Sequence, residues 1–167
     1  MRDPLAHPRP LIERVYGYVA YRIGDGPDAE DVTGETFERA LRYRDSFDPR
    51  RGDPASWLIG IARRVIVDAS LRRELVTDVL PEGAGEGHED EALRRLELRT
   101  AVSGLDERDR ELVALRFGAD LTAKQIGELL ELRTNAVEVA LHRALGRLRR
   151  HFEPPAAGAP AAAPVRV

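Results

Sequence analysis

The sequence contains no cysteine, which excludes disulfide bonds and every metal or redox site that depends on a thiolate. Aromatic residues make up only 5% of the chain, and stretches of alternating apolar and polar residues are few, so a β-sheet is not expected. No apolar run approaches the roughly 20 residues that a membrane-spanning helix needs, and no secretory signal opens the chain. These absences predict an all-α protein in the cytoplasm, without membrane insertion.

Residues suited to catalysis or metal binding are also scarce. The histidines do not fall at a ligand spacing on any one helix face. The glycine-rich run 83–87 has no strand before it, and its acidic neighbours would repel a phosphate group. His88 and Glu89 lack the second histidine of a zinc-binding H-E-x-x-H motif, because position 92 is alanine. We therefore predict no catalytic residue, no metal site and no cofactor, and an enzyme is the least favoured class.

Charged residues, by contrast, are abundant. Lysine and arginine number 26 and aspartate and glutamate number 29, which gives a net charge of −3. The whole chain is therefore not a basic nucleic-acid binder, although local basic patches can still carry phosphate contacts. A length of 167 residues suits one ordinary domain or two small ones.

Residues 120–150 form the stretch with the clearest pattern, two amphipathic helices joined by a tight turn. Thr122 and Gln125 have the spacing of a capping box, so the first helix is expected to begin at Ala123. Thr134 is expected to cap the second helix, whose apolar residues recur at helical spacing from Val137. The pattern is typical of a helix-turn-helix that offers its second helix to a DNA groove, although an ordinary helical hairpin fits equally well.

Three helices are predicted in the first part of the chain. A stripe of apolar residues predicts the first helix over residues 11–23, after a loose N-terminus at residues 1–10. Asp53 followed by Pro54 is a strong N-cap and first-turn pair for the third helix. Together the three helices carry enough apolar surface to close a small domain over residues 11–76.

The second of these helices has an acidic face. Carboxylates in the first turn favour the helix dipole, which accounts for Asp28, Glu30 and Asp31. Glu35 and Glu38 continue the acidic face beyond the first turn and indicate a docking surface.

The composition changes after the third helix. Residues 77–91 carry six carboxylates, three glycines and no basic residue, which predicts a flexible acidic linker. A second domain is expected over residues 92–152, in which Asp106 caps a helix that Gly118 closes. The alanine- and proline-rich tail 153–167 is expected to be disordered.

This arrangement resembles the extracytoplasmic-function sigma factors of bacterial RNA polymerase over roughly residues 11–150. In the first domain, the run 28–37 is similar to region 2.2 of the family, and Phe47, the run 57–63 and Asp68 are similar to regions 2.3 and 2.4. In the second domain, the matching fragments resemble region 4, and they are residues 105–108, 115–117 and 141–144.

The resemblance implies a transcription initiation factor that binds core RNA polymerase and directs it to promoters. Its partners would be the clamp of the largest subunit, the β flap and promoter DNA, and family members are often restrained by an anti-sigma factor. The polymerase-binding residues would lie on the acidic helix, and they are Asp28, Asp31, Glu35, Phe37 and Glu38. The acidic linker would either enter the active-site path of the polymerase or act as a plain tether.

The resemblance also divides the DNA contacts between the two domains. Contacts to the −10 element, including a flipped base at loop 46–52, would come from Phe47, Arg50, Arg51, Trp57, Arg63, Arg64, Arg72 and Arg73. Trp57 lies on the apolar stripe, so core packing is favoured over base stacking. Contacts to the −35 element would come from Arg133, Thr134, Asn135, Glu138, His142, Arg143 and Arg147.

The chain departs from the family pattern at three positions. Glu138 and Ala140 stand where basic residues are common, and Gly34 stands where a bulkier residue is frequent. Two alternatives therefore remain open. One is a stand-alone helix-turn-helix DNA-binding regulator, and the other is a sigma-like polymerase-binding regulator with weakened −35 recognition.

Overall fold

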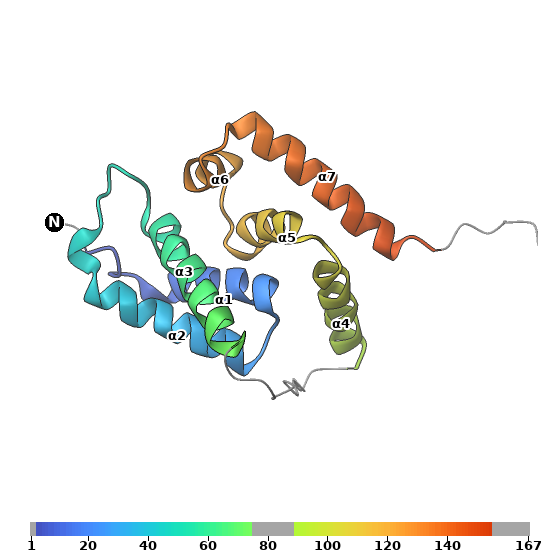
Figure 1. Ribbon diagram of the computed structural model, residues 1–167, viewed down its shortest axis with the longest axis horizontal. Coiled ribbons are helices and arrows are strands. Elements are labelled where there is room, and N and C mark those ends of the chain that lie inside the picture. The colour runs from blue at the N-terminus through green and yellow to red at the C-terminus, as the bar shows by residue number, and fades with distance from the viewer. Residues whose placement is uncertain (1–2, 75–88, 155–167) are drawn as a thin grey trace, which may run out of the picture.

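The computed structural model describes residues 3–74 and 89–154, and within these ranges it is built from helices with no strand (Figure 1). The first domain contains α1 (Pro8–Ile23), α2 (Pro27–Arg42), the 3-10 turn η1 (Arg44–Ser46) and α3 (Pro54–Glu74). The second contains α4 (Glu89–Ser103), α5 (Glu107–Val113), the π-helical turn η2 (Ala114–Gly118), α6 (Ala123–Leu130) and α7 (Thr134–Phe152). The prediction of an all-α fold is confirmed. Within the described ranges, no helix is both long enough and apolar enough to cross a membrane.

Local capping interactions place the helix starts of the second domain. The capping box of α6 is complete, because Gln125 N donates to Thr122 Oγ1 and Thr122 N donates to Gln125 Oε1 at 2.8 Å. Asp106 caps α5 by accepting a hydrogen bond from Asp109 N at 2.8 Å. Each cap satisfies backbone N–H groups that a helix start leaves without a partner. The predicted caps at Thr122 and Asp106 are confirmed.

Some element boundaries differ from the prediction. α1 begins at Pro8, so residues 8–10 are helical, because a proline in the first turn lacks only an N–H that would have had no helical partner. α4 begins at Glu89, so the last three residues of the predicted linker are helical. The rest of that linker, residues 77–88, and the tail from residue 155 lie outside the described residues.

α7 begins one residue earlier than the predicted cap implies. Thr134 is the first helical residue and Arg133 occupies the N-cap position, and no side chain there makes a capping hydrogen bond. The prediction that Thr134 caps the helix is therefore wrong. The short turn after α6, in which Glu131 adopts a left-handed φ of 57°, already sets the direction in which the chain enters α7.

Gly118 ends η2, as expected, but its role is in packing between the domains. A Cβ atom on Gly118 would lie 2.6 Å from Gly17 O, and a Cβ on Gly17 would lie 2.5 Å from Gly118 O. Both distances are far below van der Waals contact. The backbones of α1 and η2 can therefore cross only because neither residue has a side chain.

The two domains share one hydrophobic core. In Figure 1, α1 runs beneath α3 and reaches the second domain near α5. The buried side chains of this core come from both domains, and they include Val15, Val19, Leu58 and Ile59 from the first and Leu112, Leu115, Leu121 and Ile126 from the second. Fully burying an aliphatic side chain contributes about 1.5–3 kcal/mol, so this shared core holds the domains together.

Polar contacts line the same junction. Arg14 donates from Nε to Ala119 O at 2.7 Å and from a terminal nitrogen to Asp120 O at 3.1 Å. Arg99 of α4 donates to Asp25 O, at the turn between α1 and α2, at 2.6 Å. These side chains satisfy backbone carbonyls at the ends of turns, where no helical partner exists.

Candidate polymerase and DNA interfaces

The acidic face of α2 combines exposed and partly covered carboxylates. Asp31 and Glu38 are exposed, whereas Asp28 and Glu35 are half-buried. Phe37 is also half-buried and packs against the core, so only part of its ring is available to a partner. A side chain at Gly34 would meet nothing within 4 Å, so glycine is not required there by packing.

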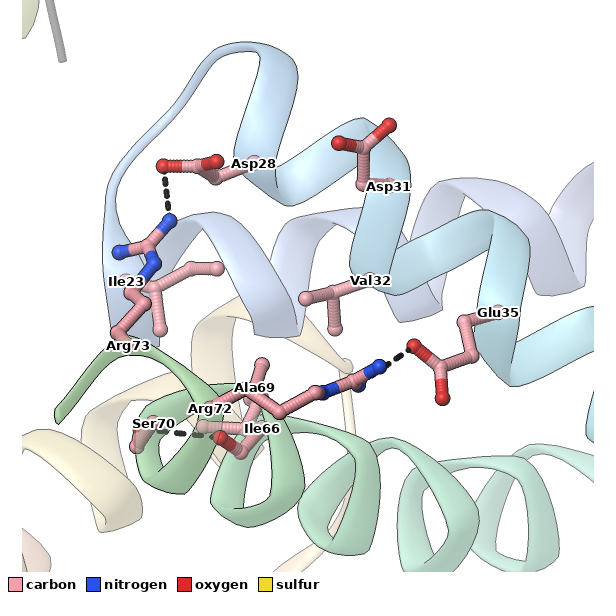
Figure 2. Close-up of a pocket in the computed structure, with 10 residues that line it drawn as sticks. All are labelled: Ile23, Asp28, Asp31, Val32, Glu35, Ile66, Ala69, Ser70, Arg72 and Arg73. Atoms are coloured by element: carbon pink, nitrogen blue, oxygen red, sulfur yellow. Dashed lines mark hydrogen bonds and ion pairs between the residues drawn. The ribbon is translucent and has the colours of Figure 1, made fainter. Parts of the chain in front are cut away.

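A groove of about 330 Å³ separates this acidic face from the end of α3 (Figure 2). Arg72 and Arg73 reach across it from α3, and Arg72 lies 3.0 Å from Glu35 Oε2 while Arg73 pairs with Asp28. The carboxylate of Asp31 points away from both arginines (Figure 2). The structure therefore joins two predicted −10 residues to two predicted polymerase-binding residues.

Glu35 is the most heavily paired carboxylate of this face. Arg39 lies 2.6 Å from Glu35 Oε1 and also 2.8 Å from Asp68 Oδ2 on α3. Partial burial raises the pKa of Glu35, but the hydrogen bonds from Arg72 and Arg39 outweigh it, and the net pKa lies below the ordinary value. Glu35 is therefore held in its charged form.

The loop before α3 packs its aromatic residue inward. Phe47 is 9% exposed, and its ring meets Trp57 edge to face with the centroids 5.5 Å apart. Trp57 is half-buried and packs against the core, in keeping with the favoured interpretation of that residue. The ring of Phe47 is buried in this arrangement, and its assignment to the −10 element stays a prediction.

The arginines of this loop lie at the surface. Arg50 Nε lies 3.0 Å from Asp48 Oδ1, and this hydrogen bond is the main reason that the pKa of Asp48 lies below its ordinary value. Arg51, next in the chain, and Arg64, on α3, are exposed and form no ion pair with any residue that the structure describes. Arg51 and Arg64 are therefore the most available of the predicted −10 cations.

Arg63 forms an ion pair with the second domain. Its Nε lies 2.7 Å from Glu111 Oε1 on α5, and the Glu111 side chain is only 13% exposed. Tyr18 donates its hydroxyl to the same carboxylate at 2.9 Å, and Arg22 Nε lies 2.8 Å from it. Burial first, and then the charge of Glu111, raise the pKa of Tyr18. In this arrangement Arg63 is not free to contact a phosphate.

The predicted −35 residues mostly share one exposed face of α7. The exposed residues are Arg133, Thr134, Asn135, Glu138, His142 and Arg143, and the opposite face buries Val137, Leu141 and Ala144. Arg147 differs, because it pairs with Asp109 of α5, whose side chain is only 8% exposed. Ala140 is half-buried and packs against the core, so of the two unusual positions only Glu138 points to solvent.

Sequence reasoning missed the cluster around Glu111. Tyr18 and Arg22 stand four residues apart on α1, so their side chains share one helix face, and this spacing is the only local signal. Glu111 lies 93 residues after Tyr18 and 48 after Arg63. Pairs at such separations cannot be read from helical periodicity.

Two protein-family models match the chain in order. Sigma-70 region 2 covers residues 9–75, and Sigma-70, region 4 covers residues 95–148. The ECF RNA polymerase sigma factor ShbA of Streptomyces griseus is 33% identical over 168 residues, which cover 88% of this chain and 84% of ShbA. The ECF RNA polymerase sigma factor BldN of Streptomyces coelicolor is 32% identical over 147 residues, which cover 83% of this chain but only 56% of BldN.

Solved structures share the fold. The sigma factor RpoE of Bartonella quintana, in complex with the anti-sigma factor NepR, superposes with a TM-score of 0.70 at 18% identity and covers 85% of this chain and 91% of its own. CnrH, in complex with the cytosolic domain of CnrY, gives a TM-score of 0.60 at 24% identity and covers 87% of this chain and 82% of its own. The chain belongs to the extracytoplasmic-function sigma factors of the sigma-70 family, the transcription initiation factors that direct RNA polymerase to promoters.

Proposed function

We propose that this chain acts in the cytoplasm as a non-enzymatic initiation factor with three separate contact surfaces. α2 docks on a basic surface of the polymerase clamp, α3 and its preceding loop contact the −10 element, and α7 contacts the −35 element. The observation that carries the proposal is the segregation of charge. α2 presents an acidic face with Asp31 exposed, whereas the exposed face of α7 carries Arg133 and Arg143.

The face of α7 has the composition that a major groove requires. Arg133 and Arg143 can contact phosphates or guanine, and Asn135 can pair with adenine. Glu138 can accept a hydrogen bond from a cytosine amino group, so an acidic residue there is compatible with base reading. The opposite face of the helix is buried, which holds these side chains on a rigid support.

Reconstitution with core RNA polymerase tests the proposal. We expect discrete transcripts whose 5′ ends lie downstream of shared −10 and −35 sequences when genomic fragments are transcribed and the ends are sequenced. A protein that forms no stable complex with core polymerase would refute it.

Charge reversal at the acidic face tests the docking surface. Asp31→Lys should weaken binding to core polymerase about tenfold or more, because like charges facing each other across an interface are strongly unfavourable. Asp31 is exposed and forms no ion pair within the described ranges, so stability, measured by thermal unfolding, should fall by no more than about 1 kcal/mol, the contribution of a carboxylate near a helix N-terminus. Glu13→Lys on α1 makes the same charge change outside the proposed face and should leave the affinity within about twofold of wild type.

Glu138 raises a second candidate function, a polymerase-binding regulator with weakened −35 recognition, which the family models and the relatives do not favour. An exposed carboxylate near the DNA backbone is repelled by phosphates, unlike one that meets a cytosine. Transcription from promoters with a scrambled −35 element separates the two functions. Unchanged output would favour the second candidate, and a large loss would favour full bipartite recognition.

The fold neighbours also bear on regulation. RpoE is described in complex with an anti-sigma factor, and CnrH in complex with the cytosolic domain of CnrY. The same helical arrangement in this chain supports a restraining protein partner of that kind. Co-purification from the native host, followed by competition with core polymerase, would test this.

A further inference from the structure

The arginines of α3 that would face promoter DNA are paired with carboxylates from outside α3. Arg63 meets Glu111 at 2.7 Å, Arg72 meets Glu35 at 3.0 Å, and Arg73 pairs with Asp28. Figure 2 shows the last two pairs spanning the groove between α2 and α3. Only Arg64, the fourth arginine in this group, forms no ion pair within the described ranges.

The carboxylates in these pairs lie outside the candidate −10 surface. Asp28 and Glu35 lie on the face of α2 that we assign to the polymerase clamp. Glu111 lies in the second domain and accepts a hydrogen bond from Tyr18, the residue that follows Gly17 in α1. An arginine that binds a phosphate must therefore leave its carboxylate. Polymerase can release the arginines paired with Asp28 and Glu35, and a domain movement can release the arginine paired with Glu111.

The pairing makes the carboxylates compete with phosphate for the same N–H groups and neutralises part of the arginine charge. Arg72 and Arg73 present their terminal nitrogens to carboxylate oxygens, which are the same kind of acceptor as phosphate oxygens. Glu111 is more sheltered than the other two acids, because Tyr18 and Arg22 surround it as well as Arg63. A phosphate group that binds the same N–H groups must displace the carboxylate.

On the basis of the proposed function, we propose that the free protein masks the α3 arginines with its own carboxylates, and that docking on polymerase unmasks them. Basic side chains of the clamp compete for Asp28 and Glu35 and so release Arg73 and Arg72. Because the same carboxylates and arginines are exchanged in both events, binding of polymerase and binding of DNA strengthen each other by the same factor.

The effect of each surface pair is modest. The side chains of Arg72 and Arg73 are 61% and 57% exposed, so solvent screens both interactions. Release of one such arginine should change affinity roughly twofold to fivefold at low salt. Two pairs acting together give an effect large enough to measure.

DNA binding by the free protein provides the first test. The probe is a fluorescent single-stranded oligonucleotide of mixed sequence and about 20 nucleotides, because phosphate contacts do not depend on sequence. The double variant Asp28→Asn/Glu35→Gln should bind roughly fivefold more tightly than wild type at low salt. Two additional phosphate contacts, at about 0.7 each for single strands, should steepen the log–log salt slope by about 1.4.

A matched control separates masking from net charge. Glu13→Gln/Glu30→Gln also removes two negative charges from exposed residues of α1 and α2, and neither residue forms an ion pair within the described ranges. This control should bind the oligonucleotide within about twofold of wild type. If it gains as much affinity as Asp28→Asn/Glu35→Gln, the masking proposal is overturned.

Adding Arg72→Gln/Arg73→Gln to Asp28→Asn/Glu35→Gln should abolish the gain, since the released side chains are then absent. A gain that persists would contradict masking. Glu111→Gln tests the sheltered pair in the same assay, provided that its thermal unfolding shows a folded protein. The two surface pairs test the proposal even if Glu111→Gln does not fold.

Polymerase binding without DNA provides the reciprocal test. Arg72→Gln/Arg73→Gln frees Asp28 and Glu35 for the clamp and should raise affinity for core polymerase roughly threefold. Arg9→Gln/Arg44→Gln removes two exposed cations that form no ion pair within the described ranges and should not raise it. Equal affinities for the two double variants would overturn the coupling, whereas absence of any polymerase binding by wild type would refute the proposed function itself.

Discussion

α3 and α7 are both arginine-rich helices, but most of the candidate DNA-contacting arginines of α3 are paired with carboxylates, whereas most of those at α7 are unpaired within the described ranges. Three of the four predicted DNA-contacting arginines of α3 are paired with carboxylates of other elements. Arg133, at the N-cap of α7, and Arg143, within α7, are exposed and form no ion pair within the described ranges, and of the predicted −35 arginines only Arg147 is paired. The difference lies in the neighbours. α3 lies between the acidic face of α2 and the second domain, whereas one side of α7 is open to solvent (Figure 1).

This comparison shows that availability, and not charge alone, distinguishes the two candidate DNA surfaces. The candidate −35 surface is exposed in this structure, whereas three of the four arginines of the candidate −10 surface on α3 are paired with carboxylates. A protein organised in this way exposes the candidate −35 helix while ion pairs restrain the arginines of the candidate −10 helix.

The largest effect is expected from breaking the junction that brings Glu111 to Arg63. Gly118→Ala places a methyl group 2.6 Å from Gly17 O, which backbone atoms cannot easily relieve. We expect a loss of roughly 3 kcal/mol in the free energy of unfolding, measured by urea denaturation. Gly146→Ala in α7 meets nothing within 4 Å and should instead stabilise the protein by about 0.5–1 kcal/mol. Equal stability of Gly118→Ala and wild type would show that the domains do not cross in this way in solution.

A smaller effect on stability should distinguish the paired Arg147 from the exposed, unpaired Arg143 of α7. Arg147→Ala leaves the buried carboxylate of Asp109 without its ion-pair partner and should cost about 1–2 kcal/mol of stability. Arg143→Ala, at an exposed site, should change stability by less than about 0.5 kcal/mol but weaken binding of the holoenzyme to −35 duplex DNA. Thermal unfolding and promoter binding, measured on both variants, distinguish the roles. Equal changes in stability and in promoter binding for the two variants would show that the two arginines do not have different roles.

The smallest effect concerns the charge state of Glu35. Its pKa in the folded protein lies below the ordinary value of 4.5, so its pairing adds stability above about pH 4.5 that is lost as the pH falls through the folded pKa. Arg72→Gln removes one of the two hydrogen bonds and should raise this pKa toward 4.5. NMR titration of the side-chain carboxyl group measures both values. An unchanged pKa in the variant would show that Arg72 does not engage Glu35 in solution.

Much of the fold could be predicted because its signals are local. The capping box at Thr122 and Gln125 and the cap at Asp106 use residues three positions apart, so they are visible in the sequence. The order of motifs along the chain is also a local signal, and it is enough to identify the family. The start of α1 at Pro8 was missed because three prolines in the first ten residues indicated loop, although two of them fit a first helical turn.

The candidate site was less predictable. The residues assigned to polymerase and DNA remain predictions, but the structure adds that several of them contact one another. Arg72 and Glu35 are 37 residues apart, and periodicity within a helix cannot show that they meet. Motif position assigns Phe47 to DNA but cannot show that its ring is buried and meets Trp57 edge to face, since that contact depends on packing of the loop against α3.

The sequence by itself determined the helices, their caps, the segregation of acidic and basic faces, and membership of the sigma family. These properties depend on residues within one or two helical turns of each other, where backbone geometry sets the spacing. The tertiary structure alone decided that two glycines cross at the domain junction, that both domains share a core, and which arginines are free. Those outcomes depend on surfaces that fold together from distant parts of the chain, and an ion pair forms only when packing brings its two charges within reach.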